Sequence, residues 1–406
     1  MNIGIFSDTY LPEVNGIVTS VVNFKQELER AGHNVYIFAP GYELISRASK
    51  RRREKNVFRF SSFQYPLYKS WRVAIPLNRG AQHTISKLKL DVVHSQHPFS
   101  MGLFATGIAW RNKIPHVHTY HTMYPEYAKI YFPGFKKWNQ KAAEKLSMLF
   151  CNRADHIIAP SDGIKTKLKS YGVTIPITVV PTGIERAFFE TKDATGSIRR
   201  KYKIPVRAPL AITVARLGKE KSIDYCLHAF KQVLRHNPDA YYLIVGDGPA
   251  KLDLQTLARE LGIIERVAFT GFVHDRADVM RAYSTANVFM YASKTETQCL
   301  TLLEAAAASV PLVARYDKPL ETALHHEVNG FFVKEDVNKF AWKVNKLLAD
   351  HKMAKKFGQE SLKIAKAGSA EHQTKELLKV YKQTVTDRIS GKLTPQEQGF
   401  LEDNLR

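Results

Sequence analysis

Short apolar runs alternate with longer amphipathic segments along most of the chain. The runs are rich in Val, Ile and Phe, which is typical of buried strands, and the segments between them repeat with the period of a helix. This alternation predicts β-α-β units, and therefore parallel sheets covered by helices on both faces. In the first half of the chain the expected strands occupy residues 2–6, 33–40, 90–96, 115–121, 155–161 and 176–183.

The series is interrupted once and then restarts. Residues 190–209 (ETKDATGSIRRKYKIPVRAP) are charged, show little apolar period and contain two prolines, so we interpret them as an interdomain linker. Further strands are expected at 210–216, 240–248, 266–273, 286–293, 310–316 and 330–333. The pattern therefore predicts one Rossmann-like domain over 1–195, a second over 196–370, and a helical segment over 371–406 that crosses back onto the first.

The expected fold class is thus α/β, with two parallel-sheet domains. In open parallel sheets, ligands bind outside the carboxyl ends of the strands. If two such domains face each other across a cleft, the cleft is the natural place for the substrates.

Composition agrees with a globular protein of two or three domains. The 406 residues are 44% hydrophobic and 24% charged, and no run approaches the roughly 18 apolar residues of a membrane span. The first residues lack the basic start of a signal peptide. Three scattered cysteines have no metal-binding or disulfide spacing, so we expect a protein of the reducing cytoplasm.

The net charge of +22 is unevenly distributed. Residues 1–200 carry 29 Lys and Arg against 14 Asp and Glu, so the first half holds most of the excess. Such a charge favours a polyanionic partner, either nucleic acid or an anionic membrane surface. A solvated basic surface without a specific partner is the alternative interpretation.

Two glutamates, Glu296 and Glu304, bracket the stretch TETQCLTLLE. Eight helical residues span up to ~12 Å, whereas the carboxylates of a glycosidase lie ~5–9.5 Å apart. Between them, Leu300 and Thr301 open an apolar helix whose first N–H groups and dipole attract anions. The pattern favours a ligand with hydroxyls at both ends and a diphosphate in the middle, which is a nucleotide sugar; two surface carboxylates are the alternative.

Other strand ends carry cationic or polar residues. Arg216 and Lys221 follow the first strand of the second domain, where they could bind a diphosphate or form an ordinary surface cluster. His121 lies just beyond the strand PHVHTYH and is a candidate polar contact or proton carrier. Gly16, in the loop after the first strand, could let a backbone N–H approach a phosphate, although a single glycine is more often a turn residue.

These motifs together resemble the retaining GT-B glycosyltransferases of family four over nearly the whole chain. The resemblance is carried by GIFSDTYLPEVNGIVTSVVN, HTYHTMY, VVPTGIE, VARLGKEKSI, IVGDGP, TGFV and TETQCLTLLEAAAASVPLVARYD. Within the family, the opening and the late VARYD stretch are most similar to the bacterial branch that glucosylates diacylglycerol.

The resemblance implies a role for each matched residue. Arg216 and Lys221 would bind the diphosphate, Glu296 the donor hexose and Glu304 the ribose. The amides of Gly16, Leu300 and Thr301 would also face the donor, and His121 would lie on the acceptor side of the sugar. Phe272 and Val273 would form the nucleobase wall, and His121, Arg216, Lys221 and Glu296 the catalytic set. Two departures, Asn15 before Gly16 and Cys299 where many relatives have a glycine-like residue, bear on which sugar fits.

The resemblance also implies the reaction. Glucose would pass from UDP-glucose to 1,2-diacylglycerol with retention of the anomeric configuration, by front-face attack in which the leaving phosphate takes the acceptor proton. No Asp-x-Asp motif occurs, so we expect no bridging metal and no other cofactor.

A lipid acceptor requires contact with a bilayer, and we expect a peripheral protein on the cytoplasmic face that binds anionic lipids. Residues 46–55 hold six basic residues and one acid, and 127–150 interleave aromatic residues with lysines, as in an interfacial helix. An ordinary amphipathic helix over the sheet is the alternative for 127–150. The expected membrane-binding residues are Arg51, Arg52, Arg53, Tyr131, Phe132, Phe135, Lys136, Lys137 and Trp138.

Three other functions stay open from the sequence. The chain could add a hexose to a glycolipid or a soluble acceptor, or it could hydrolyse or epimerise UDP-sugars without an acceptor. A nucleic-acid-binding protein is suggested by charge alone, but the sequence has no recognised RNA or DNA motif. We therefore expect no nucleic-acid partner. The sequence does not fix the oligomeric state.

Overall fold

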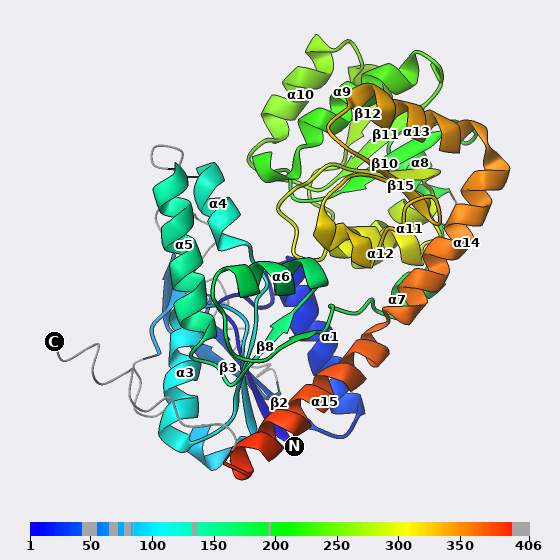
Figure 1. Cartoon of the computed structure of the whole chain (residues 1–406). Helices are drawn as coiled ribbons and strands as arrows, with labels where there is room; N and C mark the ends of the chain where they lie inside the picture. Colours follow the sequence, from blue (N-terminus) through cyan, green and yellow to red (C-terminus); the bar gives the residue numbers. More distant parts are fainter. Residues whose placement is uncertain are drawn as a thin grey trace. The chain divides into compact units, whose positions relative to one another are not determined.

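The structure is a computed structural model that describes residues 1–42, 55–64, 72–76, 83, 85–131, 136–193 and 196–391. It divides into two compact units (Figure 1). The first unit is Met1–Gly183 together with Ala370–Arg406, and the second is Ile184–Ser369. Each unit is built around its own parallel sheet.

In the first unit, seven strands of the described chain form a sheet of order β3-β2-β1-β6-β7-β8-β9. Neighbouring strands are parallel, and Ile3 of β1, an interior strand, pairs with both Val35 and Val92. The strands are β1 (Asn2–Phe6), β2 (Asn34–Pro40), β3 (Val57–Phe60), β6 (Val92–Ser95), β7 (His116–Thr119), β8 (His156–Ala159) and β9 (Ile177–Val179).

Helices connect these strands, and a small antiparallel hairpin adds β4 (Ser62–Gln64) and β5 (Arg72–Ala74). The helices of the first unit are α1 (Gly16–Arg30), α3 (Ser100–Asn112), α4 (Tyr124–Tyr131), α5 (Lys136–Cys151), α6 (Asp162–Ser170) and α15 (Ala370–Ile389).

Alternate side chains of the strands enter two cores on opposite faces of this sheet. Ile5 of β1 packs in one core with α1 and α15, which contributes Tyr381. The next residue, Phe6, packs in the other core with Met101 of α3. Helix α15 therefore belongs to the first unit, and Figure 1 shows it beside α1.

In the second unit, six strands form a sheet of order β12-β11-β10-β13-β14-β15, again with parallel neighbours. Its strands are β10 (Leu210–Val214), β11 (Tyr241–Val245), β12 (Val267–Phe269), β13 (Val288–Tyr291), β14 (Leu312–Arg315) and β15 (Gly330–Val333). β13 lies next to β10 although β11 and β12 separate them in sequence, so the sheet has a topological switch point between β10 and β13.

The helices of the second unit cover both faces of its sheet. Ala211 of β10 packs in the core that contains α9, α10 and α13, and Ile212 packs in the core that contains α11 and α12. The helices are α7 (Ala187–Glu190), α8 (Ser197–Lys201), α9 (Ile223–Leu234), α10 (Lys251–Glu260), α11 (Arg276–Ser284), α12 (Leu300–Ala307), α13 (Val337–Ala349) and α14 (His351–Ala367), with the 3-10 turns η3 (Lys219–Lys221), η4 (Ile264–Arg266) and η5 (Lys318–Thr322).

The structure corrects the expected domain boundary and the linker. The units divide after Gly183 rather than after residue 195, because Ile184 and Phe188 are buried in the core of the second unit. Residues 190–209 are not a simple linker: they contain α8, and Ile198 and Ile204 are buried in the same core. The short strands β3, β4 and β5 were not predicted.

Candidate active site

Two loops meet at the switch point of the second unit. The loop after β10 carries Arg216 and the turn η3, and the loop after β13 carries Ser293 and Glu296. Lys221, the last residue of η3, donates to Glu296: its Nζ lies 2.5 Å from Oε1. An ion pair thus joins the carboxyl ends of β10 and β13, where open parallel sheets bind their ligands.

Glu296 is held by more than one donor. The Tyr291 hydroxyl and the Ser293 hydroxyl also donate to Oε1, each at 2.7 Å, and the side chain of Glu296 is only 12% exposed. Burial by itself would raise the pKa of Glu296, but the charge and hydrogen bond of Lys221, followed by the two hydroxyls, lower it. The carboxylate is therefore ionised and rigid at neutral pH, and suited to accept hydrogen bonds from sugar hydroxyls.

Arg216 has a partner of its own in the same loop. Its Nη2 donates to Oε1 of Glu220 at 2.5 Å. The Glu220 side chain is fully buried, whereas that of Arg216 is 37% exposed. The guanidinium is thus held by a buried carboxylate and is still partly exposed to solvent, as a group that binds a diphosphate must be.

Glu304 lies in α12 behind the loop of Glu296, as expected, and is buried. The Tyr283 hydroxyl donates to Oε2 at 2.8 Å, and Nη2 of Arg276 lies 3.6 Å from Oε1. Arg276 is itself paired with Glu185 at 2.8 Å. Burial raises the pKa of Glu304, and the opposing effects of Arg276 and Tyr283 do not cancel it.

The N-terminus of α12 lies between the two glutamates. Cys299 occupies the N-cap position with φ +66°, and its side chain makes no capping hydrogen bond to the helix. Its Sγ is 3.4 Å from Oγ1 of Thr301 instead. Leu300 and Thr301 begin the helix, so their backbone N–H groups have no intrahelical acceptor and can face an anion.

The loop after β12 forms a further edge of this region. Gly271 has φ +68°, a left-handed conformation that suits glycine, and it bridges Gly246 at the end of β11. The following Phe272 is 47% exposed and contacts His274 edge to face, with ring centroids 4.8 Å apart. Val273 packs against the core. An exposed aromatic ring at a strand end offers a surface against which a planar base can lie.

The comparison with known proteins supports the same interpretation. The model of "Glycosyltransferase Family 4" matches residues 14–188, and that of "Glycosyl transferases group 1" matches 195–363. The chain is 35% identical over 346 residues to alpha-monoglucosyldiacylglycerol synthase of Acholeplasma laidlawii, covering 83% of this chain and 85% of the relative. The protein of the same name from Streptococcus pneumoniae is 33% identical over 334 residues, covering 81% and 74%.

This chain belongs to glycosyltransferase family 4. Its fold is GT-B, as predicted. Anabaena HepE in complex with UDP has a TM-score of 0.75 at 17% identity, covering 94% of this chain and 100% of that one. Sucrose-phosphate synthase from Thermosynechococcus elongatus has a TM-score of 0.74 at 18% identity, covering 95% and 99%. The family makes the chain a glycosyltransferase enzyme.

Two predicted donor or catalytic residues of this glycosyltransferase lie in the first unit. Gly16 is the exposed first residue of α1, but the next two N–H groups, of Ile17 and Val18, already donate to the Asn15 side chain. His121 is partly buried, and its Nε2–H donates to Oε1 of Gln96 at 2.7 Å. Burial lowers the pKa of His121 to about 3, so it is neutral at physiological pH and suits hydrogen bonding better than carrying a proton.

Several contact residues of the glycosyltransferase site were not predicted. They are the tyrosines that hold the two glutamates (Tyr283 and Tyr291), the partner of Arg216 (Glu220), and the pair Arg276 and Glu185. For Tyr291 there was one indication in the sequence, because this residue lies near the end of an expected strand, just before Glu296. The others come from different elements, and only the fold brings them to their partners.

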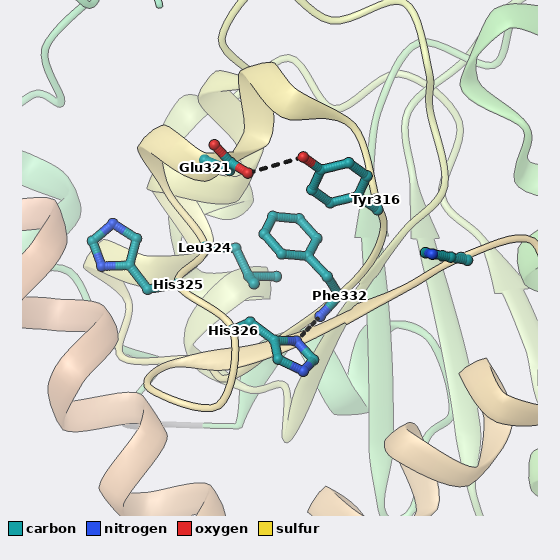
Figure 2. Close-up of a pocket in the computed structure, with 7 residues that line it drawn as sticks. Tyr316, Glu321, Leu324, His325, His326 and Phe332 are labelled. Carbon is teal, nitrogen blue, oxygen red and sulfur yellow. Dashed lines mark hydrogen bonds between the residues drawn. The ribbon is translucent and has the colours of Figure 1, made fainter. Parts of the chain in front are cut away.

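A separate cavity of about 600 Å³ lies beside β14 and β15 of the second unit (Figure 2). In Figure 2 the Tyr316 hydroxyl donates to Glu321, and Phe332 lies between these residues and His326. The cavity is lined by Tyr316, Glu321, Leu324, His325, His326, Phe332 and Lys334. None of these residues belongs to the predicted donor site of the enzyme.

The expected membrane residues fall largely outside the described part of the chain. Trp138 is described and is 73% exposed. Arg51, Arg52, Arg53, Phe132 and Phe135, and the side chains of Tyr131, Lys136 and Lys137, lie outside the described residues. Among the residues described, no helix is both long and apolar enough to span a bilayer, and no cluster of His, Cys, Asp and Glu could hold a metal ion.

Proposed function

We propose that this glycosyltransferase moves glucose from UDP-glucose to 1,2-diacylglycerol and forms 3-O-α-glucosyl-diacylglycerol. The observation that carries the donor half is the largely buried Lys221–Glu296 pair, which lies in the same strand-end region as Arg216. The acceptor half is supported by the relatives at 33% and 35% identity, which are named alpha-monoglucosyldiacylglycerol synthases.

The proposal assigns each donor group a partner in the second unit. Arg216, Lys221 and the first amides of α12 bind the diphosphate. Glu296 accepts hydrogen bonds from the glucose hydroxyls, and Glu304 accepts them from the ribose. Ionised carboxylates accept strong hydrogen bonds from hydroxyl groups, and both glutamates are held in place by tyrosine hydroxyls. Phe272 and Val273 lie against the uracil.

The proposed reaction retains the configuration at the anomeric carbon. The bond between C1 of glucose and the β-phosphate oxygen breaks while the diacylglycerol oxygen forms a bond to C1 on the same face. The leaving β-phosphate oxygen takes the proton of the acceptor hydroxyl. Negative charge grows on UDP as the bond breaks, and Arg216, Lys221 and the helix amides stabilise it. No metal enters this scheme.

We further propose that the enzyme works as a peripheral protein on anionic membranes. Helix α5 supports this through one exposed strip that combines aromatic, cationic and apolar side chains: Trp138, Lys141, Lys145, Leu146 and Leu149. A helix with exposed apolar and basic residues lies in the interface plane of a bilayer. Each basic residue near an anionic surface contributes roughly 1 kcal/mol.

The experiment incubates the purified enzyme with UDP-glucose, other UDP-hexoses and diacylglycerol in vesicles, with and without a chelator of divalent metals. We expect α-glucosyl-diacylglycerol from UDP-glucose, at the same rate with chelator, and linkage analysis of the product checks this. A product made only from a glycolipid or a soluble acceptor would replace diacylglycerol in the proposal. UDP released equally fast without any acceptor would refute transfer.

The same vesicles test the membrane proposal when their content of phosphatidylglycerol is varied. We expect flotation with the vesicles, and turnover, to rise with the anionic lipid and to fall with salt. The double variant Lys141→Gln/Lys145→Gln should weaken flotation, whereas Lys355→Gln, an exposed lysine of the second unit, should not. Flotation indifferent to anionic lipid would remove this part of the proposal.

A further inference from the structure

The loop that carries Arg216 and Lys221 contains a glycine whose backbone does not require one. Gly218 has φ −109° and ψ 157°, an extended conformation open to any residue. A Cβ at this position, however, would lie 2.3 Å and 2.4 Å from the two carboxylate oxygens of Glu220. The Glu220 carboxylate thus occupies the space that a side chain at position 218 would fill.

That carboxylate is fully buried and accepts from Arg216. Oε1 of Glu220 lies 2.5 Å from Nη2 of Arg216. The turn itself is tight, because the Lys221 N–H donates to the Gly218 carbonyl at 3.0 Å and the Gly218 N–H donates to the Arg216 carbonyl at 2.9 Å. One short segment therefore carries both cations, and Glu220 is the side chain within it that pairs with Arg216.

We infer that Glu220 is a positioning residue that holds Arg216 ready for the donor diphosphate, and that Gly218 is needed because it leaves room for the Glu220 carboxylate. This rests on the proposed function, in which Arg216 binds the diphosphate. An arginine already fixed before the ligand arrives loses less side-chain freedom on binding. The Glu220 side chain is fully buried, whereas that of Arg216 is 37% exposed.

The test compares Gly218→Ala, Glu220→Ala and the double variant in the full chain. In Gly218→Ala the new methyl group displaces the carboxylate although Glu220 is still present, so both single variants should weaken UDP binding about tenfold. The double variant should be no weaker than Glu220→Ala, because the methyl group then has nothing to displace. Calorimetry with UDP measures the three dissociation constants, and full additivity of the two effects would overturn the inference.

Uridine separates positioning of Arg216 from general damage to the loop. It lacks the diphosphate, so its affinity should be the same in wild type, Gly218→Ala and Glu220→Ala, and an equal loss for uridine and UDP would overturn the inference. Glu220→Gln keeps an acceptor oxygen and should recover part of the UDP affinity. A Gln variant as weak as the Ala variant would also contradict the inference.

Two controls complete the design. Gly107→Ala places a methyl group where no atom lies within 4 Å and should leave UDP binding unchanged, which shows that the effect belongs to position 218. Arg216→Ala separates the inference from the proposed function on which it rests. If Arg216→Ala leaves UDP affinity intact, the proposed donor site fails. If Arg216→Ala weakens UDP binding while the Gly218 and Glu220 variants do not, the inference alone fails.

Discussion

Replacing Lys221 by alanine is expected to lower turnover by about 100- to 1,000-fold, the usual effect of losing one group that stabilises transition-state charge. Two losses combine: the cation near the leaving diphosphate disappears, and Glu296 loses the partner that does most to hold its pKa down. The carboxylate keeps its hydrogen bonds from Tyr291 and Ser293, so the fold should survive. Steady-state kinetics, with thermal unfolding measured in parallel, check this expectation.

The matched control is Lys219→Ala in the same turn. Lys219 is exposed, so its removal changes the net charge of the loop equally and should alter turnover less than threefold. Tyr291→Phe removes a neutral donor from the same oxygen of Glu296 and should have an intermediate effect. A well-folded Lys221→Ala enzyme with nearly normal turnover would contradict the assigned role.

The first unit is expected to lose much of its stability as the pH falls from 8 to 5. Buried and partly buried histidines of this unit cause the loss: His94, His97, His116, His118, His121 and His156. Burial lowers their pKa values, to about 3 for His94, His97 and His121, to about 4 for His116 and His156, and well below the usual value for His118.

The sign follows from counting protons. Below pH 6.5 the unfolded chain protonates these histidines while the folded chain does not, so each one costs about 1.4 kcal/mol of stability per pH unit. Asp8 acts in the opposite direction, because burial raises its pKa to about 6 and the folded state takes up a proton first. Several histidines therefore outweigh Asp8, and the net effect of acid on this unit is destabilising.

Amide hydrogen exchange followed by mass spectrometry measures this for each unit separately. Corrected for the intrinsic pH dependence of exchange, protection of β6 and β7 should collapse near pH 5, while β10 should stay protected. His118→Gln should reduce the slope of the unfolding free energy against pH by the contribution of one histidine, about 1.4 kcal/mol per pH unit. His351→Gln replaces an exposed histidine of the second unit and should not change this slope. Unchanged protection of β6 and β7 at pH 5 would contradict the account.

The alternation of short apolar runs with amphipathic segments made most of the fold predictable. All twelve expected strands occur, since each contains a short apolar run of β-branched or aromatic residues. The strand β3 was missed because its sequence, VFRF, alternates only briefly after a strongly basic segment. The segment 190–209 was wrongly interpreted as a linker. Its buried residues, such as Ile198 and Ile204, are too few to give an apolar periodicity, although they pack in the core of the second unit.

The site was only partly visible in the sequence for a topological reason. Glu296 and Lys221 could be proposed from their motifs, but nothing in the order of the strands indicates that β13 inserts next to β10. The residues that hold the site were therefore not predicted: Tyr283 approaches Glu304 from α11, and the Glu220 carboxylate that pairs with Arg216 occupies the space left at Gly218. Such contacts depend on packing, which a single sequence does not display.

The most direct test of the account is a crystal structure of the enzyme with UDP. The account predicts the diphosphate between the N-terminus of α12 and the side chains of Arg216 and Lys221, with the ribose hydroxyls on Glu304 and the uracil against Phe272. UDP bound with its phosphates away from Arg216 and Lys221, or its ribose away from Glu304, would contradict the account at its centre.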